Sequence, residues 1–152
     1  MSLSEDQRAL LRFVYEWLFE HGRPPTSAEI AAHLQRAGSA ADVRRALSEL
    51  KVGKTILPHP VTGEIWMAGP FASSATDYSV SSARVTWWAN CAWDMLGVAA
   101  LVDQPVQMAA RCTECGDRFT ISVDDPAHVD LPPWVVHFLV PARHWYDDIG
   151  FT

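Results

Sequence analysis

The chain has 152 residues, of which 49% are hydrophobic, so it can form one domain or two small modules that share a core. A net charge of −6 argues against nonspecific binding of nucleic acid or of an anionic membrane by the whole chain. Residues 1–60 carry 8 Lys and Arg against 7 Asp and Glu, whereas residues 61–152 carry 4 against 11, which indicates two different modules. Three cysteines, with no secretory or membrane-spanning segment in the sequence, predict a reduced, soluble, cytoplasmic protein.

Two helices are expected at the start of the chain. The first has apolar residues at spacings of three and four, begins after the capping and acidic residues 4–7, and ends at Gly22. The second follows a proline-containing turn, where Thr26 or Ser27 can serve as the N-cap and Glu29 supports a capping box.

A third helix is expected from near Ser39 to Leu50, and a β-hairpin follows it, formed by residues 56–57 and 65–67. Three short helices followed by a hairpin are typical of a winged helix. We therefore assign residues 1–68 to a winged-helix-like N-terminal module.

Several basic residues lie on or near the third helix: Arg36, Arg44, Arg45, Lys51 and Lys54. In a DNA-binding winged helix, this would be the recognition helix. The nearly neutral charge of this half, in an acidic chain, favours instead a module used for packing, so DNA is not an expected partner.

Residues 69–77 contain Gly, Pro and Ser and predict a linker to a C-terminal core of residues 78–152. We expect this core to contain one helix and several short strands. The helix is expected at 91–102, and the strands at 85–88, 106–110, 119–123 and 135–140. The predicted fold class is α+β, with a three-helix module packed on a mixed core of short strands.

The segment Cys91-Ala92-Trp93-Asp94 places a thiol and a carboxylate three positions apart at the expected start of a helix. Both groups then lie on one helix face, and Asn90 as N-cap would place Cys91 in the first turn, where the helix dipole lowers a thiol pKa. A thiolate binds a soft metal and a carboxylic acid can deliver a proton, which suggests chemistry on a metal–carbon bond. The alternative is a buried helix cysteine beside an ordinary first-turn acid.

Seven tryptophans in 152 residues are a high number, and most are expected in the core or in pocket walls. Trp87 and Trp88 point to opposite faces of a strand, so only one of them can line a pocket. Trp88 and Trp93 are our candidate pocket residues. Such walls would raise the pKa of the Asp94 carboxyl and suit it to act as an acid.

Cys112 and Cys115 form a CxxC pair, which has the spacing of one half of a zinc site, but the sequence has no second pair. A redox CxxC normally opens a helix, whereas Gly116 here leads into a strand. His128 and His137 show no ligand spacing. Structural thiols, a metal knuckle, or a contribution to the site at Cys91 remain open for this pair.

The segment Trp87-Trp88-Ala89-Asn90-Cys91-Ala92-Trp93-Asp94-Met95-Leu96, an aromatic strand that runs into Cys-Ala-Trp-Asp, resembles the active-site motif of the organomercurial (alkylmercury) lyase family. The segment Arg111-Cys112-Thr113-Glu114-Cys115-Gly116 and the N-terminal helical module are also similar to that family. The resemblance covers most of the chain.

The resemblance implies a lyase-type core in which the carbon–mercury bond is broken by protonation, giving a hydrocarbon and Hg(II) in a mercury-resistance pathway. In that family, the residue matching Cys91 binds mercury, and the residue matching Asp94 contacts the metal and passes a proton from a cysteine thiol to the leaving carbon. No organic cofactor is implied. The expected partners are an organomercurial, small-molecule thiols and a mercuric-reductase-type acceptor, and the protein is a monomer or a homodimer.

Lyases of this family use a second catalytic cysteine in a late aromatic segment, which residues 145–152 approach. A further thiol, beyond Thr152 or from Cys112 or Cys115, would complete the site. Two alternatives stay open. One is a metal-sensing, thiol-sensing or DNA-binding regulator on the lyase fold, and the other is an enzyme that uses Cys91 and Asp94 on a mercury-free substrate.

Overall fold

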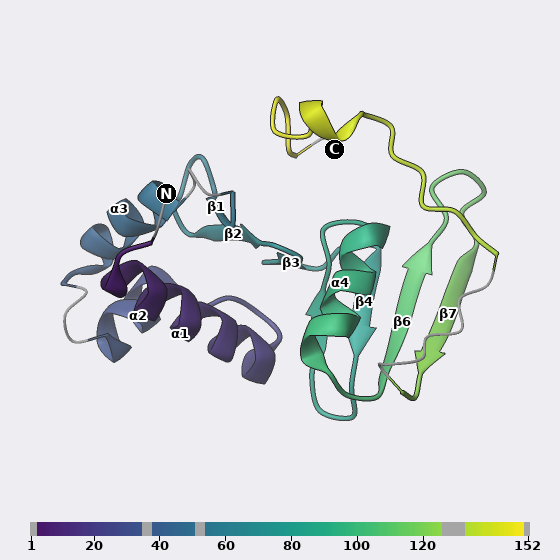
Figure 1. The fold of residues 1–152 in the computed structure, drawn as a ribbon, viewed down its shortest axis with the longest axis horizontal. Coiled ribbons are helices and arrows are strands. Elements are labelled where there is room, and N and C mark those ends of the chain that lie inside the picture. The colour runs from purple at the N-terminus through teal and green to yellow at the C-terminus, as the bar shows by residue number, and fades with distance from the viewer. Residues whose placement is uncertain (1–2, 35–37, 51–53, 126–132, 151–152) are drawn as a thin grey trace.

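The computed structural model describes residues 3–34, 38–50, 54–125 and 133–150. Within these ranges it contains four α-helices and two antiparallel sheets, in agreement with the expected α+β class (Figure 1). The helices are α1 (Glu5–His21), α2 (Ser27–His33), α3 (Ala40–Leu50) and α4 (Ala92–Val102). The strands are β1 (Ile56–Pro58), β2 (Ile65–Ala68), β3 (Phe71–Ala72), β4 (Tyr78–Ser81), β5 (Thr86–Trp88), β6 (Val106–Arg111) and β7 (Arg118–Val123).

The ends of α1 and α2 are fixed by the residues expected from the sequence. Ser4 caps α1 in a reciprocal capping box with Gln7, and Gly22 ends it in the left-handed region at a φ of 70°. Thr26 caps α2 and shares a second capping box with Glu29. Local capping chemistry therefore determines where these two helices begin and where α1 ends.

The first sheet has the order β1-β2-β3 and packs with the N-terminal helices. Residues 69–77 were expected to form a linker, but they include β3, which pairs with β2. Phe71 in β3 is only 1% exposed and makes edge contacts with the rings of Tyr15 and Phe19 of α1. The segment is thus part of the core, because two residues are enough to add a strand when an apolar ring is buried with them.

The second sheet has the order β5-β4-β6-β7, with every neighbouring pair antiparallel. Helix α4 contacts β4 and β6 and covers one face of this sheet (Figure 1). The strand expected at 135–140 is wrong: the segment is irregular, and Val135 and Leu139 are 88% and 74% exposed. Its apolar run matches a strand locally, but no neighbouring strand pairs with it among the described residues.

The two modules share one continuous apolar core. Trp87 of β5 is fully buried and donates its indole N–H to the carbonyl oxygen of Leu18 in α1, at 2.8 Å. The Tyr15 hydroxyl donates to the Gly69 carbonyl oxygen, also at 2.8 Å. These contacts fix the strand that leads to Cys91 against the first helix. None of the helices in the described ranges is long and apolar enough to cross a bilayer.

Candidate active site

Cys91 lies between β5 and α4 and is itself the N-cap of the helix, with extended backbone angles of −150° and 178°. Its Sγ accepts a hydrogen bond from the backbone N–H of Asp94, at 3.4 Å. The sulfur takes the place that a Ser, Asp or Asn oxygen usually has at a helix start. The expectation that Asn90 would be the N-cap is therefore wrong by one residue, and Cys91 stands at the positive end of the helix rather than inside its first turn.

Asp94 is the third residue of α4, so its backbone N–H and its carboxyl both lie beside Cys91. Burial raises the pKa of the Asp94 carboxyl, although hydrogen bonding from the side chains of Asn90 and Cys91 works in the opposite direction. The sequence had also predicted a raised pKa for the Asp94 carboxyl. The carboxyl therefore retains its proton to a higher pH than an exposed aspartate does.

The pKa of the Cys91 thiol is raised, mainly by burial, and the negative charge of Asp94 adds to the effect. Backbone N–H groups of Asp94 and Trp93 lower it, but they do not compensate for the burial. The sequence had suggested a lowered pKa because the helix dipole was visible in it and the desolvation was not. The site thus places a thiol with a raised pKa beside a carboxyl whose pKa is also raised.

Asn90 connects the start of α4 to the segment before β3 through two hydrogen bonds. Its backbone N–H and its side-chain Nδ2 both donate to the carbonyl oxygen of Pro70, at 3.4 and 3.0 Å. Its Oδ1 is buried and has no hydrogen-bond partner within the described part of the chain. Because Pro70 directly precedes β3, Asn90 links the residues that hold Cys91 to the first sheet.

A cavity of about 380 Å³ opens in front of Cys91 and Asp94, and Asn90 also lines it. Trp93 lines the cavity with a ring that is 58% exposed, so it stands at the surface. The candidate pocket residue Trp88 is not among the lining residues, and its neighbour Trp87 is fully buried.

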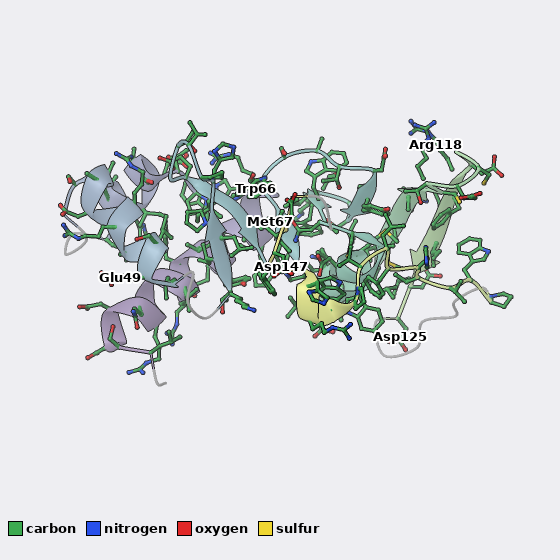
Figure 2. The ribbon with its side chains drawn as sticks, turned by 90° about the horizontal axis from the view of Figure 1, so that it is seen from above. Glu49, Trp66, Met67, Arg118, Asp125 and Asp147 are labelled. Atoms are coloured by element: carbon green, nitrogen blue, oxygen red, sulfur yellow. The ribbon has the colours of Figure 1, made fainter. Side chains whose placement is uncertain are left out.

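Much of the cavity wall comes from segments that sequence reasoning did not assign to the site. Strands β1 and β2 contribute Leu57, Trp66 and Met67. The terminal segment after residue 133 contributes Phe138, Trp145, Tyr146, Ile149 and Gly150. Figure 2 shows Trp66 and Met67 in the same central region as Asp147 of the terminal segment. The cavity therefore lies between the two sheets, with the terminal segment along one side.

Lys54 also lines the cavity, and its Nζ lies 3.8 Å from the centre of the Tyr146 ring. This cation–π contact connects the N-terminal module to the terminal segment. Gly150 lies so close to Trp66 that an added Cβ would be 3.0 Å from its ring. No local pattern marked these residues, since each joins the site through a contact between segments distant in sequence.

Cys112 and Cys115 occupy the turn between β6 and β7 and do not line the cavity. They are unpaired thiols, Cys112 half-buried and Cys115 exposed. His128 falls outside the described residues, and His137 is exposed. In the described ranges, no three His, Cys, Asp or Glu side chains come together as a metal site.

The MerB alkylmercury lyase family model matches residues 71–151, more than half of the chain. A solved structure described as the mercury-bound form of MerB2 superposes with a TM-score of 0.61 at 18% sequence identity. The match covers 82% of this chain and 58% of that one, so the chain spans less than two thirds of that protein's length. At this identity the superposition shows a shared fold. A comparison with curated proteins gave no match.

Proposed function

The chain belongs to the alkylmercury lyase family, and from that premise we propose that it breaks the carbon–mercury bond of an organomercurial by adding a proton to carbon. The products are a hydrocarbon and Hg(II). The observation that carries the proposal is the pairing of a thiol and a half-buried carboxyl at the start of α4, both open to one cavity.

Cys91 is the mercury ligand in this proposal. An organomercury cation R–Hg⁺ arrives with a weakly bound anion, the Cys91 sulfur replaces that anion, and the thiol proton passes to Asp94. The raised pKa of Asp94 suits it to hold this proton. The carboxylic acid then protonates the carbon bound to mercury, R–H leaves, and Hg(II) remains on the sulfur with the carboxylate as neighbour. No electron is gained or lost from outside, since the proton takes the place of mercury on carbon.

The cavity walls suit the organic group of such a substrate. Leu57, Met67 and Phe138 present apolar surface, and Trp66 and Trp93 add aromatic surface. A volume of about 380 Å³ accommodates a short alkyl group or a single aromatic ring. Small-molecule thiols would then remove the product ion, because thiolates are the ligands that a soft ion prefers.

The test is benzene release from a phenylmercury salt in excess small-molecule thiol, measured with the chain and with its Cys91→Ser variant. We expect release by the unmodified chain and none by the variant. The control is Ser73→Ala, which alters a residue at the cavity edge that contributes no thiol or carboxyl. Equal release by the unmodified chain and Cys91→Ser would refute the proposal. Binding of mercury without benzene release would favour a mercury-binding regulator on this fold.

For the N-terminal module we propose a winged-helix-like unit, covering residues 1–68, that packs against the core and does not bind DNA. Arg44 lies 3.4 Å from the Glu64 carboxylate, and Arg45 lies 2.8 Å from Asp42. The two central basic residues of α3 are thus engaged within the module. A DNA mobility shift that weakens with salt would contradict this role.

A further inference from the structure

The turn that carries Cys112 and Cys115 has a fixed backbone. The Cys112 N–H donates to the Asp117 carbonyl oxygen at 2.8 Å, and the Gly116 N–H donates to the Cys112 carbonyl oxygen at 2.9 Å. Gly116 closes the turn at a φ of 78°, a conformation that favours glycine. Arg111 donates from Nε to the Gly116 carbonyl oxygen at 3.2 Å, which places a positive charge beside the turn.

The backbone of this turn directs its N–H groups at the two sulfurs. The Cys112 sulfur accepts hydrogen bonds from the backbone N–H groups of Cys115 and Glu114, which lower the pKa of this thiol. The Cys115 sulfur accepts from the backbone N–H of Asp117, but contacts with the Cys112 thiol and the Asp117 carboxylate raise its pKa overall. The two thiols also contact each other. The turn therefore holds two sulfurs side by side, with backbone N–H groups directed at both.

The sulfurs of Cys112 and Cys115 suit a soft metal ion that binds two ligands. A structural zinc site needs four ligands, and in the described ranges no set of three His, Cys, Asp or Glu side chains, this pair included, is placed to hold a metal ion. Hg(II) differs from zinc because two thiolates in a linear arrangement satisfy its coordination, and thiolate is the ligand type that soft metals prefer. Two adjacent thiols, one half-buried and one exposed, can satisfy this ion, whereas zinc needs two further ligands.

The sheet brings this turn to the same end as Cys91. Strands β5 and β6 both pair antiparallel to β4, so they run in the same direction and the residues that follow them emerge at one end of the sheet. Tyr78 begins β4 at that end, and its backbone carbonyl accepts from the N–H of Ala89, two residues before Cys91. Tyr78 also pairs with Ala110 of β6, which lies two residues before Cys112.

The Tyr78 hydroxyl interacts electrostatically with both Cys91 and Cys112. Burial is the main reason why the pKa of Tyr78 is raised, but the negative charges of Cys91 and Cys112 both add to it. Tyr78 thus lies within electrostatic range of the catalytic candidate and of the turn. Cys91 and the Cys112–Cys115 turn therefore lie at the same end of the sheet, although of these three cysteines only Cys91 lines the cavity.

We propose that the Cys112–Cys115 turn is an acceptor site for Hg(II), which takes up the ion left on Cys91 as a complex of two thiolates. The acceptor role rests on the proposed lyase function. In the exchange, the Cys112 thiolate bonds to Hg(II) and the Cys91–mercury bond breaks. Cys115 then gives its proton to solvent, and its sulfur displaces the water or anion that is the second ligand of the ion. Cys91 regains a proton, and mercury stays Hg(II) throughout.

The first experiment needs no turnover. Mercuric chloride is added to the Cys91→Ser variant in the presence of competing glutathione, and bound mercury is measured after gel filtration. We expect one Hg(II) per chain, and retention that falls to background when either Cys112→Ser or Cys115→Ser is added. Equal retention with and without these cysteines, or no retention by Cys91→Ser, would overturn the site.

The second experiment tests the transfer. One equivalent of a phenylmercury salt reacts with the unmodified chain without added thiol, and free thiols are then alkylated and identified by mass spectrometry. In the unmodified chain we expect Cys91 to become alkylated, while bound mercury protects Cys112 and Cys115. In the Cys112→Ser/Cys115→Ser variant we expect mercury to stay on Cys91 and to protect it. Protection of Cys91 in the unmodified chain after benzene release would overturn the acceptor role.

The two proposals fail in different ways. If no benzene forms but Cys91→Ser retains Hg(II) through Cys112 and Cys115, the lyase function is refuted and the metal site stands. If benzene forms in excess small-molecule thiol at the same rate with and without Cys112 and Cys115, the pair lies outside the catalytic step, as proposed. A loss of release in that assay would instead place the pair in the reaction itself and overturn the acceptor assignment.

Discussion

Replacement of Gly22 by alanine tests whether the first helix holds the strand that leads to the site. Gly22 ends α1 at a φ of 70°, and a Cβ at this position would overlap the backbone carbonyl oxygen of Thr86, the first residue of β5. Backbone atoms of a paired strand cannot rotate away as a side chain can. The Gly22→Ala variant must therefore strain the helix end, displace β5, or both.

Gly63 provides a matched control for the size of the effect. It has the same φ of 70°, but a Cβ there would approach only the flexible side chain of Arg44, with Cδ at 2.9 Å. The left-handed backbone alone costs an alanine about 1–2 kcal/mol at either position. At Gly22 alone, the added methyl group must also displace packed backbone atoms, which costs about 1–3 kcal/mol more. We expect Gly63→Ala to lose about 1–2 kcal/mol of unfolding free energy and Gly22→Ala about 2–5 kcal/mol.

Urea denaturation of the two variants and the unmodified chain, followed by tryptophan fluorescence and by circular dichroism, gives the free energies of unfolding. Coincidence of the two signals checks that the modules unfold together, as one shared core requires. The alkylation rate of Cys91 in the folded state should rise in Gly22→Ala and stay unchanged in Gly63→Ala. Equal losses of stability in both variants would refute the rigid contact between Gly22 and Thr86.

Three further predictions concern ionisable groups. Asp94→Asn should retain mercury binding but lower benzene release by about 10²–10⁴-fold in the phenylmercury assay, because the proton donor is lost. The rate of Cys91 alkylation by iodoacetamide should stay low at neutral pH and keep rising above pH 9, the ordinary value for the thiol, and Asp94→Asn should move the midpoint down. Glu29, whose pKa is lowered to about 2 by Arg23 and the Thr26 backbone, should stabilise the fold fully above about pH 4.5 and lose that effect as pH falls through about 2. Glu29→Gln should thus cost about 1 kcal/mol at pH 7 and much less at pH 2, as measured by urea denaturation at both values.

Features governed by short-range chemistry could be predicted from the sequence. Ser4 and Gly22 bound α1 because capping and the left-handed turn depend only on adjacent residues. Cys91 and Asp94 lie together at the start of α4 because they are three residues apart at a helix start. The thiol pKa was predicted in the wrong direction, since the sequence shows where a helix begins but not how much water reaches its end.

Features that depend on long-range pairing could not be predicted. The apolar run 135–140 has the composition of a strand, but strand formation needs a neighbouring edge, and this segment runs instead along the cavity. Phe71 looked like part of a linker because two residues carry no periodicity. Lys54 and Tyr146 meet across 92 positions of sequence, so neither could be assigned to the site.

The sulfur ligand at the start of α4 favours soft cations over the others that could reach it. A metal ion must displace the proton of the Cys91 thiol, and each unit by which burial raises that pKa adds about 1.4 kcal/mol to the displacement. The cost of displacing the thiol proton is the same for every cation, but the free energy gained from the new bond to sulfur differs. Oxygen-preferring ions such as Mg²⁺ and Ca²⁺ gain little from a sulfur ligand, whereas a soft organomercury cation gains enough to exceed the cost. In the proposed reaction, the displaced proton is released within one helical turn of Asp94, so the step that selects the metal would also supply the proton that breaks the carbon–mercury bond.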